Sequence, residues 1–495
     1  MLLLKLDEKC RKPQYQQIIE QIRLKIETRI LHPGEKLPST RQLAEKLGIH
    51  RSTVANAYQE LWAMGFVDLR PGSCPRVRNR AEIATADNRP EKGQLNWNVL
   101  ASTASNSLLH TYRRFYSETN PKNSSSIINF GSMDMDCRLF PQENFRSCIN
   151  RAIKEHGVTL LSYGAHTGFP PLREYIARHL QNHGICVTSE EILITNGAQQ
   201  GIDLVLRMIA SPGKTVAIES PTYKEIIPLL RFYGLKPLEI PIRHDGMDLS
   251  ILMEMIQKEP PALIYTMPNF QNPTGVSTSQ AHREQLLSIC ELHGIPILED
   301  GFDEEMKYFG RVVLPIKSMD QHYLVIYCGT FSKVLFPGVR IGWLAAEKEC
   351  IDRLIAIRRF SELSSSMILQ AAIFEFCQNG YYDRHISKMH RVFRKRMQTA
   401  LRALHQHLSP EWAEWTEPSG GYLIWLKLKP VSSPLPDLDS FLASFGVRVA
   451  PGNYFFFSGT TDTYLRLSIS ALSEEEIIAG VQRLASALGY LYTQK

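Results

Sequence analysis

Residues 329–340, GTFSKVLFPGVR, place one lysine among small hydroxylated residues, with an arginine beyond a Pro-Gly pair. The cations are Lys333 and Arg340, and Thr330 and Ser332 supply the hydroxyls. Hydroxyls and a guanidinium together can hold a phosphate, and a lysine amine beside them can attack an aldehyde. An exposed loop with ordinary surface cations would have the same composition. The neighbouring segments are therefore needed to distinguish a phosphate site from such a loop.

Two further segments end apolar runs in polar side chains. Asn272 stands before a proline in YTMPNFQNPTG, and Glu299 and Asp300 close the apolar run in IPILED. A carboxylate that closes a buried strand costs desolvation energy unless a cation meets it. A surface carboxylate at the start of a loop is the simpler alternative.

A third segment, ITNGAQQGIDLVLRMI, has the pattern of a strand, a glycine turn and a helix that begins near Ala198. The free N–H groups and the positive dipole end of such a helix suit a phosphate. Most turns of this kind are only connections, so this segment predicts a phosphate site only together with the residues around Lys333.

Predicted β-strands would hold these polar side chains in place. From about residue 127, β-branched runs alternate with helical patterns, and the clearest runs are EILITN, TVAIESP, PALIYTMP, IPILED and LVIYCGT. The alternation predicts an α/β domain with a largely parallel sheet covered on both faces. Such sheets bind ligands at the carboxyl ends of their strands, which would bring the polar segments together. From about residue 370, helices and the runs GGYLIWLKL and TYLRLSIS predict a small α+β C-terminal subdomain.

In their order and spacing, ITNGAQQ, ESPTYKE, PNFQNPTG, ILEDGF, GTFSKVLFPGVRIGW and YLRLSIS resemble the motifs of class I aminotransferases of fold type I. The resemblance covers roughly residues 127–490 and implies a pyridoxal 5′-phosphate (PLP) site in which Lys333 carries the internal aldimine. It also implies that Asp300 pairs with the pyridine nitrogen, that Asn272 meets the ring hydroxyl and that Tyr223 stacks on the ring.

The same resemblance implies contacts for the cofactor phosphate and for an amino-acid ligand. The residues that would hold the phosphate are Ala198 and Gln199 through their backbone, Ser332, Arg340 and Thr330. Tyr163, in LSYGAHTG, would reach the phosphate of a neighbouring subunit. Arg466 would clamp the α-carboxylate of an amino acid through two hydrogen bonds. Without the resemblance, Arg466 is equally well explained as a surface arginine at a strand edge.

One position departs from that family. Where Asp-x-Tyr is usual, this chain has Asp300-Gly301-Phe302, so a hydroxyl that donates to the ring oxygen is missing. Loss of this hydrogen bond slackens control of the cofactor's electronics and weakens the expectation of efficient transamination. Phe302 could instead simply pack, and cofactor binding survives the change in either case.

The first eighty residues have the pattern of a small, separate domain. Residues 13–31 have apolar side chains at helical spacing up to Ile30, and a second helix starts at a capping box of Ser39 and Gln42 and stops at Gly48. A third helix follows in HRSTVANAYQELWAMG, and FVDLRPGSCPRVRNR adds two extended pieces around Arg70. The pattern predicts a winged helix-turn-helix, which is mainly α.

The third helix of this domain has one apolar and one polar face. Its predicted inward residues are Val54, Ala57, Tyr58 and Leu61. Docked in a major groove, its N-terminal end would bring bases or phosphates within reach of Arg51, Ser52 and Thr53. Arg41 and Arg70 would contact backbone phosphates. A small three-helix interaction module with a solvated polar face is the alternative.

The charge distribution favours DNA as the partner. Residues 1–80 hold 15 Lys and Arg against 8 Asp and Glu, whereas the other residues hold 41 against 42. The excess positive charge therefore belongs to the end of the chain where a polyanion would be met.

The segment PGEKLPSTRQLAEKLGIHRSTVANAYQELWAMGFV resembles the GntR-type winged helix, whose family binds operator DNA as dimers. Together, the two resemblances identify the chain as a member of the MocR/GabR-type subfamily of GntR regulators. They imply a winged helix at 10–79, a linker at 80–126 with a helix around Leu95–Tyr116, and a PLP domain at 127–490. They further imply a homodimer that binds double-stranded operator DNA and senses a small amino acid or amine through its lysine.

Composition excludes several other classes of protein. The chain has 495 residues, of which 44% are hydrophobic and 21% charged, as in globular proteins of more than one domain. No apolar run approaches the roughly 20 residues that span a bilayer, and MLLLKLDEKC is too short and too soon acidic for a signal peptide, so we expect a cytoplasmic protein without a membrane partner. The nine cysteines contain no CxxC pair, which predicts neither disulfides nor a zinc site, and no metal is expected.

The leading hypothesis is a PLP-dependent transcriptional regulator. The alternative is a working aminotransferase of 2-amino acids that carries a DNA-binding domain, because Arg466, Asn272, Asp300 and Tyr223 are retained. A DNA-binding protein with an inactive scaffold domain is a third possibility, and the retained cofactor contacts argue against it. The effector, the operator and the sign of regulation are left open by the sequence.

Overall fold

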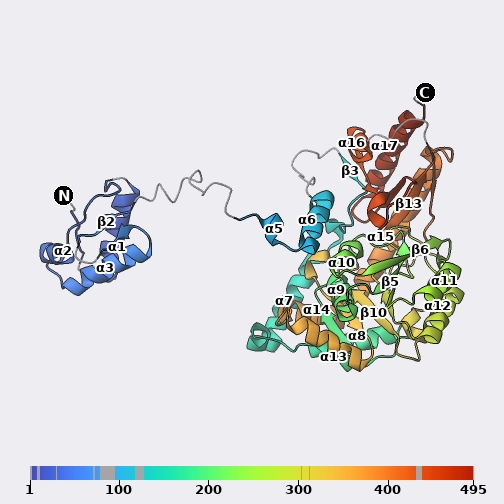
Figure 1. The fold of residues 1–495 in the computed structure, drawn as a ribbon, viewed down its shortest axis with the longest axis horizontal. Coiled ribbons are helices and arrows are strands. Elements are labelled where there is room, and N and C mark those ends of the chain that lie inside the picture. The colour runs from blue at the N-terminus through green and yellow to red at the C-terminus, as the bar shows by residue number, and fades with distance from the viewer. Residues whose placement is uncertain are drawn as a thin grey trace. The chain divides into compact units, whose positions relative to one another are not determined.

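The structure is a computed structural model that describes residues 3–7, 12–28, 30–70, 73–78, 95–116, 127–302, 304–310, 313–430 and 437–493. Its internal contacts divide the chain into two compact units, Met1–Ala101 and Ser102–Lys495 (Figure 1). Within the described ranges, none of the helices combines the length and the apolar character needed to cross a membrane.

The smaller unit has the predicted winged helix-turn-helix architecture. Its elements are α1 (Gln14–Glu27), α2 (Thr40–Leu47), α3 (Arg51–Ala63) and a hairpin of β1 (Val67–Asp68) and β2 (Arg76–Val77). The capping box at α2 is confirmed, because the Ser39 and Gln42 side chains each accept a hydrogen bond from the other residue's backbone N–H. Gly48 ends α2 in the left-handed conformation, with φ of 66°. Residues 71 and 72, in the predicted wing, lie outside the described residues.

The apolar face of α3 forms the centre of this unit's core. The four residues predicted to face inward, Val54, Ala57, Tyr58 and Leu61, are at most 1% exposed. Helix α1 is shorter than predicted and ends at Glu27, where Thr28 turns its hydroxyl back onto the Leu24 carbonyl. Leu31 then folds into the core, which leaves Ile30 62% exposed rather than on the apolar face of a longer helix.

The larger unit is organised around an eight-stranded sheet. Its strand order is β4-β11-β10-β9-β8-β5-β6-β7, and the pairs among β10, β9, β8, β5 and β6 are parallel. The antiparallel members are β11, between β4 and β10, and β7 at the far edge. The strands are β4 (Ile192–Thr195), β5 (Thr215–Ser220), β6 (Lys236–Arg243), β7 (Gly246–Met247), β8 (Ile264–Thr266), β9 (Ile297–Asp300), β10 (Val325–Thr330) and β11 (Gly342–Ala345).

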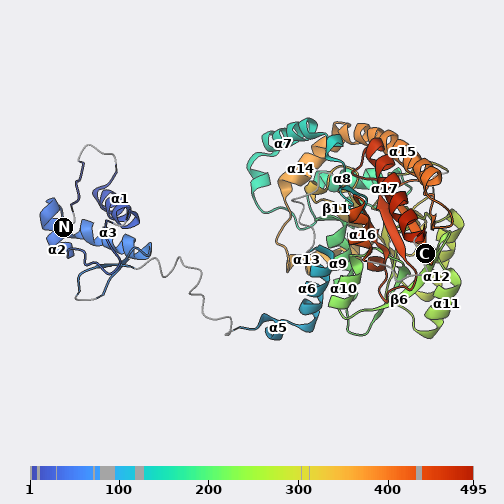
Figure 2. The same cartoon turned by 90° about the horizontal axis from the view of Figure 1, so that it is seen from above.

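Helices cover both faces of the sheet, as the alternation predicted. In β5, Val216 and Ile218 pack in the cluster that contains α9 (Ala198–Ile209), α10 (Ile226–Phe232) and α13 (Lys348–Arg359). The intervening Ala217 packs against α11 (Leu249–Lys258) and α12 (Gln280–His293), which lie side by side in Figures 1 and 2. Burial on both sides explains why these strands are continuous apolar runs rather than alternating ones.

The C-terminal part forms the predicted small α+β subdomain around a second sheet. The sheet order is β12-β13-β16-β15, built from β12 (Ala413–Trp415), β13 (Leu423–Leu428), β16 (Tyr464–Ser468) and β15 (Ala450–Pro451). Helices α14 (Met367–Gln378), α15 (Tyr381–His407), α16 (Leu438–Ser444) and α17 (Glu474–Thr493) complete it. A short parallel pair of β3 (Ile128–Asn129) and β14 (Val447–Arg448) joins the start of this domain to its end.

Further helices precede the strands of the sheet along the chain. The stretch predicted to be a linker contains α5 (Trp97–Leu100) and α6 (Thr103–Tyr116), close to the helix expected around Leu95–Tyr116. Helix α6 belongs to the larger unit and packs on α10, where the Tyr116 hydroxyl donates to the Glu225 carboxylate at 2.5 Å. Helices α7 (Gln142–His156) and α8 (Pro170–Gln181) then pack against α14.

Candidate functional site

Lys333 lies in the loop that follows β10, with its side chain half-buried. Its Nζ donates to the backbone carbonyl of Met133 at 3.0 Å, and the Tyr422 hydroxyl donates to the carbonyl of Lys333 itself at 3.3 Å. Strand β10 pairs with β9 so that Cys328 stands opposite Asp300. The predicted carboxylate, at the last residue of β9, and the predicted lysine, in the loop after β10, therefore stand at the carboxyl ends of adjacent strands.

The Asp300 carboxylate is buried, with 3% of the residue exposed. Its Oδ2 accepts a hydrogen bond from the Tyr265 hydroxyl at 2.8 Å, whereas Oδ1 is buried without a partner among the described residues. Burial raises the pKa of Asp300 to about 6, against the hydrogen bonds from Tyr265 and from the Phe302 backbone. A buried carboxylate oxygen without a partner is suited to a cationic N–H from a ligand.

Tyr265 was not among the predicted site residues. The residue sits in the middle of β8 in an apolar run and is fully buried, so it has the pattern of a core aromatic. Only the pairing of β8 with β9 reveals that its hydroxyl reaches Asp300. This hydrogen bond fixes the orientation of the carboxylate and leaves Oδ1 for a ligand.

Arg466, on β16 of the small subdomain, is 3% exposed and points toward the same edge. Its Nη1 donates to Asn272 Oδ1 at 3.3 Å and its Nη2 to the Gly131 carbonyl at 2.6 Å. Among the described residues its Nε is buried without a partner, and the acceptors of its other two nitrogens are an amide oxygen and a backbone carbonyl rather than a carboxylate. Burial lowers the pKa of Arg466 to about 10, so the guanidinium stays charged at neutral pH. A buried cation without an anion is suited to a carboxylate ligand.

A cradle for a phosphate forms where β4 turns into α9. The N-cap, Gly197, has φ of +81° and no side-chain cap, which leaves the first N–H groups of α9, including those of Ala198 and Gln199, for a ligand. Arg340 crosses this turn and donates from Nη2 to the Asn196 carbonyl at 2.9 Å. A Cβ atom at position 197 would lie 2.8 Å from Arg340 Nη2, and the positive φ at this position favours glycine.

The two hydroxyls near this cradle differ in their partners. Ser332 is buried, and its Oγ has no partner among the described residues, so it is open to a phosphate oxygen. Thr330 Oγ1 donates to the Ile341 carbonyl at 3.2 Å and accepts from the Ser332 N–H at 3.1 Å. Thr330 therefore shapes the loop that presents Ser332, and Ser332 is the better placed of the two for a phosphate.

Two other predicted residues line the same region. Tyr223 is half-buried in the loop after β5, and burial raises the pKa of its phenol, so the ring stays neutral. Asn272 is 4% exposed and is tied to Arg466. Phe302 is 8% exposed and packs in the cluster of Tyr265, Leu298 and Cys328, which agrees with a packing role. Tyr163 is 78% exposed, and its predicted contact with a neighbouring subunit stays a prediction.

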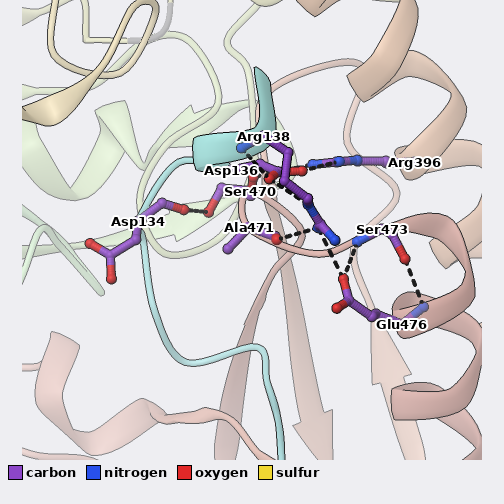
Figure 3. Close-up of polar contacts among 8 residues, drawn as sticks. All are labelled: Asp134, Asp136, Arg138, Arg396, Ser470, Ala471, Ser473 and Glu476. Carbon is purple, nitrogen blue, oxygen red and sulfur yellow. Dashed lines mark hydrogen bonds and ion pairs between the residues drawn. The ribbon is translucent and has the colours of Figure 1, made fainter. Parts of the chain in front are cut away.

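A polar network anchors the segment that supplies Gly131 and Met133 (Figure 3). Asp136 is buried and accepts hydrogen bonds from Arg138 and from Arg396 of α15. Burial alone would raise the pKa of Asp136, but these two arginines hold it below its usual value. Arg138 also bonds Glu476 at 3.1 Å, and Ser470 Oγ donates to the Asp134 carbonyl at 2.7 Å. The network fixes the two backbone carbonyls that meet Lys333 and Arg466.

The residues predicted to contact DNA lie on the surface of the smaller unit. Arg41, Arg51, Ser52 and Arg70 are exposed and Thr53 is half-buried. Arg51 Nε donates to Thr40 Oγ1 at 3.2 Å, which joins the start of α3 to the start of α2. His50 caps α3, because its Nδ1 accepts a hydrogen bond from the Ser52 backbone N–H at 3.3 Å. The structure thus brings Arg51, Ser52 and Thr53 together at one helix end.

Comparison with known proteins agrees with both units. Residues 126–484 match the family described as aminotransferase class I and II, and residues 14–77 match the bacterial regulatory proteins of the gntR family. The chain is 30% identical to the uncharacterized HTH-type transcriptional regulator YdfD of Bacillus subtilis, over 95% of each protein. It is 28% identical to the probable rhizopine catabolism regulatory protein MocR of Rhizobium meliloti, over 98% of this chain and 96% of that protein.

The chain belongs to the aminotransferase class I and II family, in its GntR-fused, MocR-type subfamily. Among solved structures, the large unit is similar to LysN, the α-aminoadipate aminotransferase of Thermus thermophilus, in complex with N-(5′-phosphopyridoxyl)-L-leucine. The TM-score is 0.74 at 30% identity, and the match covers 80% of this chain and 99% of that one.

The cofactor of this MocR-type chain is pyridoxal 5′-phosphate. The polar atoms of the site fit it. Asp300 Oδ1 offers an acceptor for a pyridinium N–H, and the uncapped start of α9 and the Ser332 hydroxyl offer donors for a phosphate. The buried Arg466 offers a separate site for a ligand carboxylate.

Proposed function

We propose that this protein is a PLP-dependent transcription regulator that senses an amino acid in its large unit and changes the DNA binding of its winged helix. The observation that carries the proposal is the presence, in one chain, of a basic helix end and a buried arginine, Arg466, without an acidic partner among the described residues. The first suits a polyanion, and the second suits the carboxylate of a small ligand.

In the large unit, the ligand is recognised by its two charged ends. When bound, PLP supplies an aldehyde for the ligand's amine and a ring that withdraws electrons. Arg466 and Asn272 position the carboxylate, and Asp300, oriented by Tyr265, keeps a proton on the ring nitrogen. Lys333 is the amine that the ligand must displace, and the Met133 carbonyl accepts its hydrogen bond. Ala198, Gln199, Ser332 and Arg340 hold the phosphate end.

In the small unit, Arg51, Ser52 and Thr53 are proposed to enter a major groove while Arg41 and Arg70 contact phosphates. The working form is proposed to be a homodimer, because the gntR family is expected to bind operator DNA as dimers and the exposed Tyr163 is available to a neighbouring subunit. We also propose that it acts in the cytoplasm, where it would meet operator DNA.

The test uses full-length protein and the DNA upstream of its own gene. Fluorescence anisotropy measures the Kd of the complex while a panel of amino acids and amines is added. We expect one class of amino compound to change the Kd in wild type and not in Lys333→Ala. A Kd that no amino compound moves would contradict a sensing role.

Aminotransferase activity is the second candidate function, because every polar group placed at the cofactor is retained apart from the hydroxyl missing at Phe302. Single-turnover conversion of the bound cofactor to its pyridoxamine form, followed by absorbance, separates the two functions. Complete conversion within seconds by a 2-amino acid would favour the enzyme. Slow spectral exchange without conversion would favour the sensor.

A further inference from the structure

A second group of chemically active side chains lies between α8, extended by the turn after it, and the loop that follows β9. His179 and His183 are four residues apart, and Glu305 faces both from the loop. The Glu305 Oε1 atom lies 2.8 Å from His179 Nε2 and 3.3 Å from His183 Nε2. We propose that these three side chains bind a Zn²⁺ ion.

The ligand set and the spacing both fit zinc. His179 lies in the last turn of α8 and His183 in the turn that follows it, and both Nε2 atoms face Glu305 Oε1, so the two imidazoles can converge on one ion. Two histidines and a carboxylate are a common zinc set, with bonds of about 2.0–2.2 Å, which puts neighbouring ligand atoms about 3.4 Å apart. The possible ligand atoms of all three residues lie within 4.8 Å of one another. Small side-chain movements would therefore admit the ion.

The surroundings hold the rings and leave room for a fourth ligand. The Tyr175 ring stacks on His179 with a centroid distance of 6.1 Å, and the Tyr382 ring meets His179 edge-on at 5.7 Å. A cavity of about 20 Å³ is lined by His179, His183 and Glu305 among others, which is enough for one water molecule. The side chains of the three proposed ligands are 15–24% exposed, so an ion can enter from solvent.

The ion would reinforce connections that hydrogen bonds already make between α8, this loop and the small subdomain. The loop that carries Glu305 begins after Asp300 and continues to Tyr308 and Phe309, whose N–H groups donate to the Ser419 carbonyl at 3.0 and 2.9 Å. Zinc would tie α8 to this loop, and so to the small subdomain. Bound Zn²⁺ should therefore raise the temperature of unfolding.

The chain offers a matched control. Glu155, His156 and Glu375 also gather potential ligand atoms within 4.8 Å, but with a single imidazole and two carboxylates that repel each other. His156→Ala removes a histidine of the larger unit without touching the proposed site. The absence of a CxxC pair does not bear on this site, because its ligands are histidines and a glutamate.

The experiment compares untagged, full-length, cofactor-loaded wild type with His183→Ala, His179→Gln and His156→Ala. Each protein is stripped with a chelator, and Zn²⁺ affinity is measured by competition with a chromophoric chelator and by thermal shift. Removal of a supporting residue near a metal weakens binding by about 10- to 100-fold, so loss of a ligand should weaken it by more. Wild type and His156→Ala should bind one equivalent per chain more than His183→Ala and His179→Gln.

The possible results either support the proposed zinc site or overturn it. A Zn²⁺-dependent rise in unfolding temperature, present in wild type and His156→Ala and lost in the two ligand variants, supports the site. Equal zinc binding by all four proteins, or none by wild type, would overturn it and leave a metal-free pair of hydrogen bonds from the histidines to Glu305. If the ligand variants do not fold, zinc titration of stripped wild type still decides whether the equivalent exists.

Discussion

The two units differ in where their candidate binding charges lie, which is on the surface in the small unit and in the interior in the large unit. In the small unit, Arg41, Arg51 and Arg70 are exposed, and the described core beneath them is entirely apolar apart from Gln17. In the large unit, Arg466 and Asp300 are buried, and each holds one polar atom without a partner among the described residues. A surface for a polyanion needs solvated cations that adapt to it, whereas a site for one small ligand needs buried charges that are already oriented.

Lys333 provides the largest expected contrast between the units. Lys333→Ala should abolish the visible absorbance of the lysine-bound cofactor while leaving the basal Kd for DNA within about twofold, because the two sites lie in separate compact units. Absorbance spectra and fluorescence anisotropy measure the two effects on one preparation. Lys348→Ala, an exposed lysine of α13, is the control and should change neither. Loss of basal DNA binding in Lys333→Ala but not in Lys348→Ala would contradict the independence of the two sites.

Arg466 tests whether the buried cation of the large unit selects carboxylates. Arg466→Lys keeps the charge but loses the planar pair of donors, so affinity for an amino acid should fall by roughly 2–3 kcal/mol. The measurement is a spectral titration with an amino acid and with the matching amine that lacks the carboxylate. Only the first should weaken. An equal loss for both compounds would show that Arg466 holds the fold rather than the ligand.

Asp300 makes the stability of the large unit depend on pH. Its folded pKa of about 6 lies above its ordinary value of 3.8, so the folded apoprotein holds this proton more tightly than the unfolded chain. The stability this proton contributes is present at low pH and is lost as pH rises through about 6. Apo Asp300→Asn should match wild type near pH 4 and exceed it by up to about 3 kcal/mol near pH 8. Denaturant unfolding across this range measures it, and parallel curves would contradict the prediction.

The exposed cations should give the smallest effects. Arg51→Ala should weaken operator binding by about 1–3 kcal/mol if the side chain reads a base. Arg41→Ala and Arg70→Ala should instead lower the slope of log affinity against log salt by about 1 each, with little change in sequence preference. Anisotropy titrations at several salt concentrations, with operator and scrambled DNA, separate these cases. An unchanged slope would remove Arg41 and Arg70 from the DNA interface.

The parts of this molecule that depend on local sequence could be predicted, and the parts that depend on long-range pairing could not. The capping box at Ser39 and the apolar face of α3 are local, and both are confirmed. The parallel strands could be predicted from the sequence because burial on both faces makes them continuous apolar runs. The antiparallel insertion of β11 between β10 and β4 left no such sign.

The same distinction holds in the site. Lys333, Asp300 and Arg466 stand at motif positions, whereas the Tyr265 hydroxyl reaches Asp300 only through the pairing of β8 with β9. Asp136, Arg396 and Glu476 come from three distant segments, and no spacing in the sequence relates them. The proposed zinc site combines local and long-range contacts, because its two histidines are close in sequence and Glu305 is remote.

The most direct test of the account is a paired titration of one preparation of full-length, cofactor-loaded protein on its own upstream DNA. An amino compound is added while cofactor absorbance and DNA anisotropy are recorded together. We predict that both signals change over the same concentration range, and that Arg466→Lys shifts both to higher concentration by the same factor. A spectral change that runs to completion while the Kd for DNA stays constant would contradict it.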